Sequence, residues 1–287
     1  MAQNRRRERI GGMGDFILGF LFVIAFSILA VVTMVKTRFN NRLRIALLCI
    51  SVLAFFFLKG GHLIPLIPKL FGSEGVRATA GEVGLQHIAR FSLPLTIVAL
   101  VLTLGLTFIM GRAVCGYGCP VGALQELLYD IQTERKGIKK LILPSRISFF
   151  IRLGLLFIIV GLFLSLGLDL IQVIAPYQLW RIEIAVPGVI FMGAFFLASP
   201  FIYRPFCRLF CPYGAIAALI AKFSILRLEK TNSCTECNLC NIKCPTGELD
   251  HNYGECYLCG RCYHACNIDS LEFFLPWERL VKDHSKQ

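Results

Sequence analysis

The chain has 287 residues, of which 56% are apolar and 17% are charged, and its mean hydropathy is +0.66. Soluble domains carry about 45–50% apolar and about 25% charged residues, so this composition excludes a disordered chain and argues against a soluble two-domain enzyme. The net charge of +12 would favour nucleic-acid binding in a soluble protein. In a membrane protein it predicts basic cytoplasmic loops. No basic tract is interleaved with aromatic residues, so we expect a protein embedded in lipid, without a nucleic-acid partner.

Five apolar stretches approach or reach the length of about 20 residues that a membrane span requires. They are residues 16–35, 45–58, 91–111, 147–168 and 184–203. The sequence therefore predicts a mainly α-helical, polytopic transmembrane bundle of four to five spans. For the first stretch, a signal peptide is the alternative to a retained helix. Arg152, near the start of the fourth stretch, is expected to reach the lipid headgroups.

Basic residues between the spans predict the orientation of the chain. The stretch 111–146 is rich in Lys and Arg, which places it in the cytoplasm by the positive-inside rule. Everything after Arg204 is then cytoplasmic as well. Hydropathy falls after Lys222, and the remainder is polar and rich in cysteine. We therefore divide the chain into an extra N-terminal transmembrane helix (1–40), a membrane domain (41–228) and a cytoplasmic cluster-binding domain (229–287).

Eight of the 13 cysteines form two runs that share the spacing C-x2-C-x2-C-x3-C. The runs are Cys234, Cys237, Cys240 and Cys244, then Cys256, Cys259, Cys262 and Cys266. In bacterial two-cluster ferredoxins the fourth cysteine of each run ligates the other cluster. The spacing thus predicts a dicluster ferredoxin-like α+β module with one [4Fe–4S] cluster on Cys234, Cys237, Cys240 and Cys266, and a second on Cys256, Cys259, Cys262 and Cys244. Two structural zinc sites are the alternative, although zinc sites need only paired C-x2-C motifs.

A second group of cysteines lies in an internal repeat. Residues 112–123 read RAVCGYGCPVGA and residues 204–215 read RPFCRLFCPYGA, and such repeats predict two similar halves packed about an axis along the membrane normal. Proline is favoured at the first position of a helix, so each CxxxCP motif is expected to begin a short helix. If the halves face each other, four thiolates form a full ligand set for a third metal centre: Cys115, Cys119, Cys207 and Cys211. Redox-active thiols and purely structural cysteines are the alternatives.

The order of apolar spans, CGYGCPVGAL, CRLFCPYGAI and a dicluster tail resembles the NapH/NosR-type family of membrane polyferredoxins. The resemblance covers about residues 41–274 and implies a four-span core, to which the N-terminal helix is an addition. It implies a quinol-oxidising electron-transfer protein of the cytoplasmic (inner) membrane with two cytoplasmic [4Fe–4S] clusters. The quinone pool and a protein redox partner, or a multisubunit respiratory complex, would be its partners. No flavin-binding domain is present, so the shorter NapH-like form is closer.

The sequence therefore leaves three functions open. The first and favoured one is a membrane-bound electron carrier, whose enzymatic form would be a quinol dehydrogenase subunit. The alternatives are an accessory redox protein used to mature another metalloenzyme, and an iron–sulfur redox sensor or anchor subunit. No Ser-His-Asp set, Gly-rich phosphate loop or pair of catalytic carboxylates is recognisable in the sequence, so we expect no hydrolytic or group-transfer chemistry.

Overall fold

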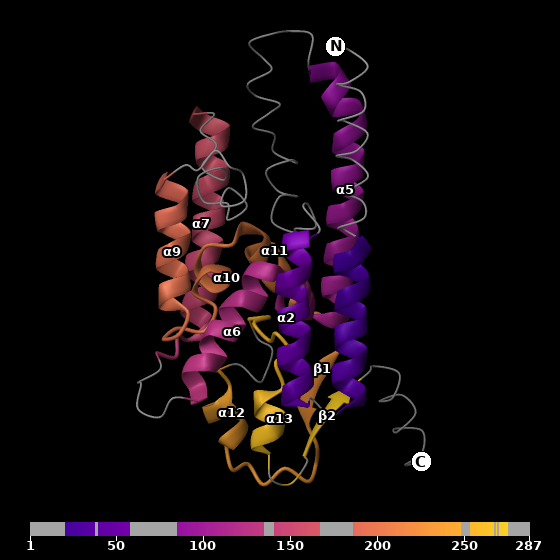
Figure 1. Cartoon of the computed structure of the whole chain (residues 1–287), viewed down its shortest axis with the longest axis vertical. Helices are drawn as coiled ribbons and strands as arrows, with labels where there is room; N and C mark the ends of the chain where they lie inside the picture. The colour runs from indigo at the N-terminus through magenta and orange to yellow at the C-terminus, as the bar shows by residue number, and fades with distance from the viewer. Residues whose placement is uncertain are drawn as a thin grey trace.

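Long apolar helices run side by side along the long axis of the molecule, and the cysteine-rich tail lies beneath one end of them (Figure 1). The computed structural model describes residues 21–37, 40–57, 85–134, 141–166, 186–247, 253–266, 268 and 270–274. The long helices are Leu21–Lys36, α2 (Asn41–Phe57), α5 (Leu85–Met110), α7 (Ser145–Leu166) and α9 (Val186–Ala198). Each of the five predicted apolar stretches therefore contains a helix.

The helix α7 carries the clearest membrane span. Within the described part of the chain, its segment Ser145–Leu162 alone is both long and apolar enough to cross a bilayer, whereas Leu21–Lys36 and Ile97–Met110 are apolar but shorter. Its outer side chains are exposed in the isolated chain, Phe157 by 69%, as expected of a helix that faces lipid. The structure thus supports a mainly helical protein, with one described helix that is long and apolar enough to span a membrane, and it does not confirm a bundle of four to five spans.

Each CxxxCP motif joins a long helix to a shorter one. After α5 the chain forms a π-helical segment, η2 (Val114–Gly118), and then α6 (Pro120–Glu134). After α9 it forms α10 (Pro205–Leu209) and then α11 (Pro212–Ala221). Both α6 and α11 begin at the proline of their motif, which confirms the prediction made from the sequence. Short segments of π-helix are rare and are frequently found at functional sites.

The tail folds into a small α+β module. Strand β1 (Arg227–Lys230) pairs antiparallel with β2 (Leu271–Phe274), with Leu228 opposite Phe273. Between the strands lie two short helices in mutual contact, α12 (Leu239–Lys243) and α13 (Arg261–Ala265). The ferredoxin-like architecture predicted from the spacing is present in the described residues.

The largest cluster of buried side chains lies where the two CxxxCP motifs and the tail meet. It contains all four CxxxCP cysteines together with aromatic side chains of both halves and of the tail, among them Tyr203, Phe206, Tyr213 and Tyr257. Tyr129 and Tyr203 meet edge to face, as do Tyr203 and Tyr257. The core is therefore centred on the second group of cysteines.

Candidate iron–sulfur centres

The two cysteine runs of the tail adopt the same local structure. Cys240 in α12 and Cys262 in α13 are buried, and each helix follows a residue in the left-handed conformation, Asn238 and Gly260. Each helix ends at the fourth cysteine of its run, Cys244 or Cys266, where the backbone turns extended.

The sulfur atoms predicted to hold the second tail cluster are electrostatic neighbours. Burial raises the pKa of Cys262 well above its ordinary value, and the thiols of Cys259, Cys256 and Cys244 raise it further. Cys244 belongs to the first run, so its influence fits the exchange of fourth ligands between runs. The Sγ of Cys244 also lies within hydrogen-bond distance, 3.2 Å, of the hydroxyl of Thr246.

Both groups of cysteines lie within the residues that the structure describes. Among those residues, no three His, Cys, Asp or Glu side chains form a group that could hold a single metal ion.

The four CxxxCP cysteines (the CxxxCP quartet) also lie together. Each is at most 7% exposed, and all belong to one buried cluster. Burial and the neighbouring thiols of Cys119 and Cys115 together raise the pKa of Cys207 to about 12, although Arg204 and Arg112 act to lower it. The two halves of the repeat thus face each other across the quartet, and the residues fit a third cluster.

Backbone amides point at one sulfur of each motif. The Gly214 N–H donates a hydrogen bond to the Sγ of Cys211 at 3.3 Å, and the Gly122 and Val121 N–H groups donate to Cys119. Both cysteines precede the first residue of a helix, where the helix dipole favours a thiolate. Hydrogen bonds to sulfur and net charge are the means by which a protein sets the potential of a cluster.

Two glycines make this packing possible. A Cβ at Gly122 would lie 2.5 Å from the carbonyl oxygen of Cys115, and one at Gly214 would lie 3.0 Å from that of Cys207. The positions are equivalent in the repeat, and each glycine faces the carbonyl of the first cysteine in its own motif. A side chain there would push the helix away from the cysteine loop.

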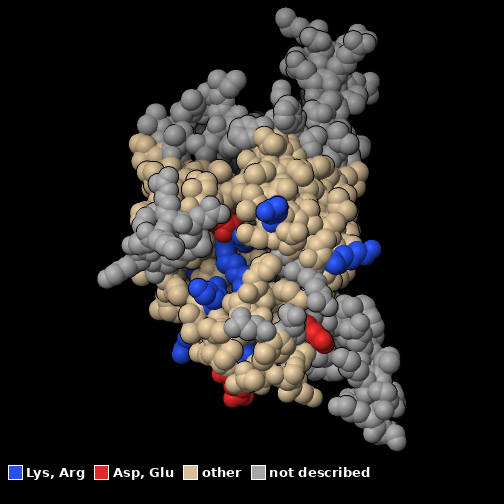
Figure 2. Space-filling view, turned by 60° about the horizontal axis from the view of Figure 1, so that its bottom comes forward, with Lys and Arg blue, Asp and Glu red and all other residues tan. Residues whose placement is uncertain are grey.

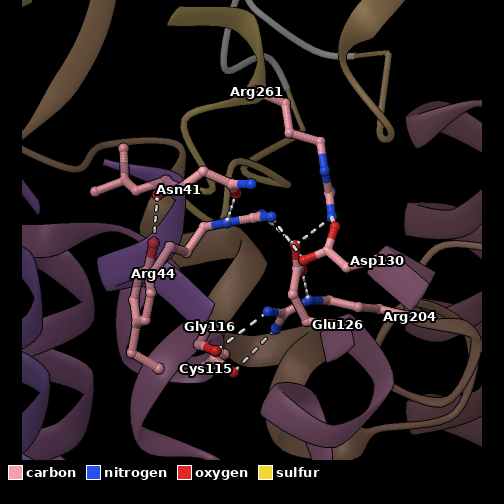
Figure 3. Close-up of polar contacts among 10 residues, drawn as sticks. Asn41, Arg44, Cys115, Gly116, Glu126, Asp130, Arg204 and Arg261 are labelled. Atoms are coloured by element: carbon pink, nitrogen blue, oxygen red, sulfur yellow. Dashed lines mark hydrogen bonds and ion pairs between the residues drawn. The ribbon is translucent and has the colours of Figure 1, made fainter. Parts of the chain in front are cut away.

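An arginine from each half reaches across to the other half. Arg204 donates to the carbonyl oxygens of Cys115 and Gly116 at 3.2 and 3.1 Å (Figure 3). Arg112, its equivalent in the repeat, donates to the carbonyl oxygen of Cys207 at 3.3 Å. Arg204 holds a left-handed backbone conformation (φ 48°), which is costly for a residue other than glycine and clusters at functional sites.

The carboxylate partner of Arg204 belongs to a buried network on α6. Glu126 accepts from Arg204, Arg44 and Arg261 at 2.7, 2.9 and 2.6 Å, and Asp130 pairs with Arg44 and Arg261 (Figure 3). Burial alone would raise the pKa of Glu126, but Arg261, Arg204 and Arg44 together hold it well below its ordinary value. The network ties α2, the second half and the tail to α6.

A second network is centred on a tail residue, Glu255. Its carboxylate lies 2.8 Å from Arg208, 3.1 Å from Arg152 and 3.8 Å from Arg112, and it accepts a hydrogen bond from Ser148. The expectation that Arg152 reaches the lipid headgroups is wrong, because its side chain is fully buried and pairs with Glu255. The repeat explains the arrangement: the position equivalent to Glu126 is Ala218, so the second half has no carboxylate there, and the tail provides one.

The tail loop beside Glu255 packs directly on both halves. The Tyr117 hydroxyl donates to the carbonyl oxygen of Leu258 at 3.0 Å, and a Cβ at Gly116 would lie 3.0 Å from the carbonyl oxygen of Tyr257. On the other side, Gly254 (φ +61°) approaches α11 so closely that a Cβ would lie 2.2 Å from the carbonyl oxygen of Ala218. The residues between Cys256 and Cys259 are therefore inserted between the tail cluster site and the quartet.

Sequence reasoning identified the cysteines and missed the charged residues around them. Charged side chains are sparse over much of the face shown in Figure 2, and several gather near its centre. The repeat did contain a signal, because Arg112 aligns with Arg204 at its first position. No periodicity or spacing identifies Glu255 as the partner of Arg112, since that pairing is created by folding the tail back onto the bundle.

Comparison with known families shows that both halves of the repeat match the same family. The family described as a 4Fe-4S binding domain (Fer4_5) matches residues 92–139 and again residues 184–230. Each match contains one CxxxCP motif, and neither contains the tail runs. The matched segments thus coincide with the internal repeat.

Relatives share most of the chain. Protein NirI of Paracoccus denitrificans is 37% identical over 179 residues, which are 57% of the chain and 26% of NirI. The regulatory protein NosR of Stutzerimonas stutzeri is 26% identical over 274 residues, which are 86% of the chain and 36% of NosR. An uncharacterized protein of Methanocaldococcus jannaschii, MJ0750, is 33% identical over 204 residues, which are 68% of the chain and 85% of that relative. The chain belongs to the NapH/NosR-type family of membrane ferredoxin-type electron-transport proteins.

Membership of the NapH/NosR-type family confirms the resemblance drawn from the motifs. It establishes an iron–sulfur electron-transfer protein with membrane-associated relatives. No solved structure matches the chain, so the arrangement of the arginines and of the tail loop comes from the present structure. The number of clusters, their ligands and the direction of electron flow go beyond what family membership establishes.

Proposed function

We propose that this protein is a membrane-bound electron carrier that moves electrons between the quinol pool and a protein redox partner through three clusters in series. Two would be [4Fe–4S] clusters in the tail and the third would be an iron–sulfur centre at the CxxxCP quartet. The observation that carries the proposal is the insertion of Tyr257, which belongs to the loop between Cys256 and Cys259, into the buried cluster that contains the quartet. One short loop thus contacts both sites.

The residues give each site a separate role. Clusters, when bound, accept and release single electrons; the protein holds them, excludes water and tunes their potentials. Cys237 is exposed and Cys234 is partly exposed, so the first tail site is the one that a protein partner can approach. The quartet is buried at the base of the apolar helices, which is the side from which a lipid-soluble quinol would deliver electrons. In this proposal the tail lies on the cytoplasmic side, as expected from the basic stretch 111–146 by the positive-inside rule.

Iron quantification and quinol mixing test the proposal together. Purified, anaerobically reconstituted protein is expected to contain about 12 iron atoms, since each cubane holds four. When the oxidised protein is mixed with a quinol analogue, reduction of the clusters is expected to bleach their visible absorbance. A content of about 8 iron atoms would restrict the clusters to the tail, and absorbance that does not respond to any quinol would overturn the quinol half of the proposal.

A matched pair of variants assigns the iron. Replacing Cys119 and Cys211 together by Ser removes one ligand from each half and is expected to lower the iron content by about a third. Replacing Cys49 by Ser is the control, because that cysteine lies on α2 outside both groups. If the double variant retains all its iron, the quartet has a structural or dithiol role.

One observation favours a regulatory function as the second candidate. A relative matched over 86% of the chain is named a regulatory protein, and a sensor would use clusters without continuous turnover. A sensor is expected to undergo a single reduction by quinol and no sustained electron transfer to an artificial acceptor. Steady-state reduction of such an acceptor at many turnovers per chain distinguishes the carrier from the sensor.

A further inference from the structure

Among the residues that the structure describes, six arginine side chains lie inside the protein, and they outnumber their carboxylate partners. They are Arg44, Arg112, Arg152, Arg204, Arg208 and Arg261. Among the described residues, their ion-pair partners are three carboxylates: Glu126, Asp130 and Glu255. A buried charge is costly unless it is paired, so the surplus of positive charge calls for a further anion.

The surplus is larger around Glu255. Three arginines share Glu255 alone, which leaves two positive charges unmatched among the described residues. The other three share Glu126 and Asp130, which leaves one. Both networks reach the quartet, because Arg112 and Arg152 donate to the carbonyl oxygen of Cys207 and Arg204 donates to that of Cys115.

Several guanidinium nitrogens near the quartet also lack a hydrogen-bond acceptor. Within the described part of the chain, this holds for the Nε atoms of Arg112 and Arg152 and for one terminal nitrogen of Arg208. Buried donors are rarely left without an acceptor in proteins. Unpaired donors beside an excess of positive charge are the features of a site made for an anion.

Two of these arginines are arranged symmetrically about one ring (the arginine clamp, Arg112 and Arg204). The guanidinium carbon of Arg112 lies 4.4 Å from the ring centroid of Tyr257, and that of Arg204 lies 4.6 Å from it. The two arginines are equivalent in the repeat, and both lie over the ring of this one tail residue. Burial lowers the pKa of Arg112, but Tyr257, Cys115, Glu255 and Cys207 together raise it above its ordinary value.

We propose that the arginine clamp supplies the counter-charge for an anionic iron–sulfur centre at the CxxxCP quartet and raises its reduction potential above those of both tail clusters. This inference rests on the proposed function, because it needs the third centre to exist. A cubane with four thiolates carries a net negative charge of about two, and of about three after accepting one electron. Positive charge nearby favours the more negative, reduced form.

The consequence is that, at equilibrium inside the chain, an electron resides at the quartet. Between the sites, one electron leaves a tail cluster, which is oxidised, and is taken up at the quartet, which is reduced, with no bond made or broken; net flow to a partner then requires the partner to draw the electron back through the tail. The quartet is then the centre that is reduced first, and the tail clusters exchange electrons with a partner. Without the clamp, the added negative charge would be buried among apolar side chains and reduction would be disfavoured.

A redox titration of the wild-type holoprotein, followed by electron paramagnetic resonance, tests the order directly. The signal of the quartet is the one that disappears when Cys119 and Cys211 are both replaced by Ser. It is expected to develop at a higher potential than both remaining signals. If it develops at a lower potential than either, the inference is wrong, whether or not any arginine variant folds.

Charge variants then test the cause. Arg112→Gln leaves Glu255 paired with Arg152 and Arg208, so the fold is expected to persist. The reduced-to-oxidised ratio of the quartet at a fixed potential is expected to fall at least about tenfold, which is 59 mV for one electron. Arg112→Lys keeps the charge and is expected to restore most of the ratio.

Arg44→Gln is the matched control. It removes the same charge from a buried site, but the thiol in its surroundings is Cys259 of the tail. It is expected to shift a tail signal and to leave the quartet signal in place. The inference is overturned, while the third centre stands, if the potential of the quartet signal does not change in Arg112→Gln. It is also overturned if that potential changes as much in Arg44→Gln. An iron content that does not change in the double cysteine variant overturns the third centre itself.

Discussion

The cysteines of the tail and those of the CxxxCP quartet offer the same ligand atom in two different environments. In the tail, Cys237 is exposed, Cys234 is partly exposed, and the supporting elements are two short helices and one strand pair. In the quartet every cysteine is buried, and arginines donate to the carbonyl groups of the first cysteine in each motif. The comparison teaches that burial and charge, and not the ligand atom, distinguish the two groups of cysteines.

The two sites also depend on each other for structure. The repeat provides Glu126 for Arg204, but the second half has Ala218 at the equivalent position, and Glu255 of the tail takes the role of the carboxylate. The tail is therefore the third component of a site whose other two components are the halves of the bundle. This dependence can be tested by variants that act on one site through the other.

The largest effect is expected from Glu255→Gln. The change leaves Arg112, Arg152 and Arg208 buried without any carboxylate among their described partners. Removing one member of a buried ion pair costs about 3–5 kcal/mol, so the free energy of unfolding should fall by about that amount. Thermal unfolding in detergent, monitored by circular dichroism, measures the loss.

Glu126→Gln provides the matched control for that variant. Arg44 and Arg261 keep Asp130 as a partner, so the destabilisation should be clearly smaller. Equal losses in the two variants would show that the tail carboxylate has no special position, and the comparison of the two networks would fail.

A smaller effect is expected where the tail loop touches α11. Gly254→Ala forces a left-handed alanine and places a Cβ against the carbonyl oxygen of Ala218. Left-handed backbone costs about 1–2 kcal/mol and overpacking about 1–3 kcal/mol, so a loss of about 3 kcal/mol is expected. Limited proteolysis should then release the tail, because its docking surface is displaced.

Gly247→Ala separates the two causes. Gly247 has the same kind of backbone (φ +68°), but a Cβ there would meet nothing closer than 4.0 Å. Only the backbone cost is expected, with the tail still docked. Release of the tail by both variants would attribute the effect to local strain and not to contact with α11.

Much of this arrangement could be predicted from the sequence. The spacing of the eight tail cysteines reflects local chain geometry around a cluster, and the prolines after Cys119 and Cys211 mark the starts of α6 and α11. Apolar stretches predict helices because backbone groups must pair internally in lipid. Features that depend on a few neighbouring residues can therefore be recognised in the sequence alone.

The charged interior could not be predicted in the same way. Composition and the positive-inside rule attribute the surplus of Lys and Arg to cytoplasmic loops, and Arg112 counts among those loop charges. The structure buries Arg44 and Arg112 in ion pairs, so part of the surplus is structural and carries no topological information. Pairings between residues 82 or more positions apart, such as Arg44 with Glu126, arise only from tertiary packing.

The exposure of the two sites predicts an order of cluster loss. Treatment of the holoprotein with ferricyanide and a chelator should first release about 4 iron atoms, from the site that includes the exposed Cys237. The quartet should be the last to lose iron, because its cysteines are buried beneath both halves and the tail. Iron release followed with time, with the double Cys119 and Cys211 variant as the control, measures the order. Simultaneous loss of all the iron would contradict the difference in accessibility.

The smallest effect is expected from a single hydroxyl group. Tyr117→Phe removes the hydrogen bond to the carbonyl oxygen of Leu258 and leaves that buried acceptor without its donor, at a cost of about 1–3 kcal/mol. Tyr213→Phe is the control for the tail loop, because its hydroxyl lies 3.4 Å from Thr107 of α5, inside the bundle. Both variants should lower the melting temperature slightly, but only Tyr117→Phe should loosen the tail loop and increase its hydrogen exchange. Because this loop contacts both sites, Tyr117→Phe should also slow electron transfer between the tail and the quartet. An unchanged rate in Tyr117→Phe would mean that the Leu258 contact secures the fold without positioning the centres.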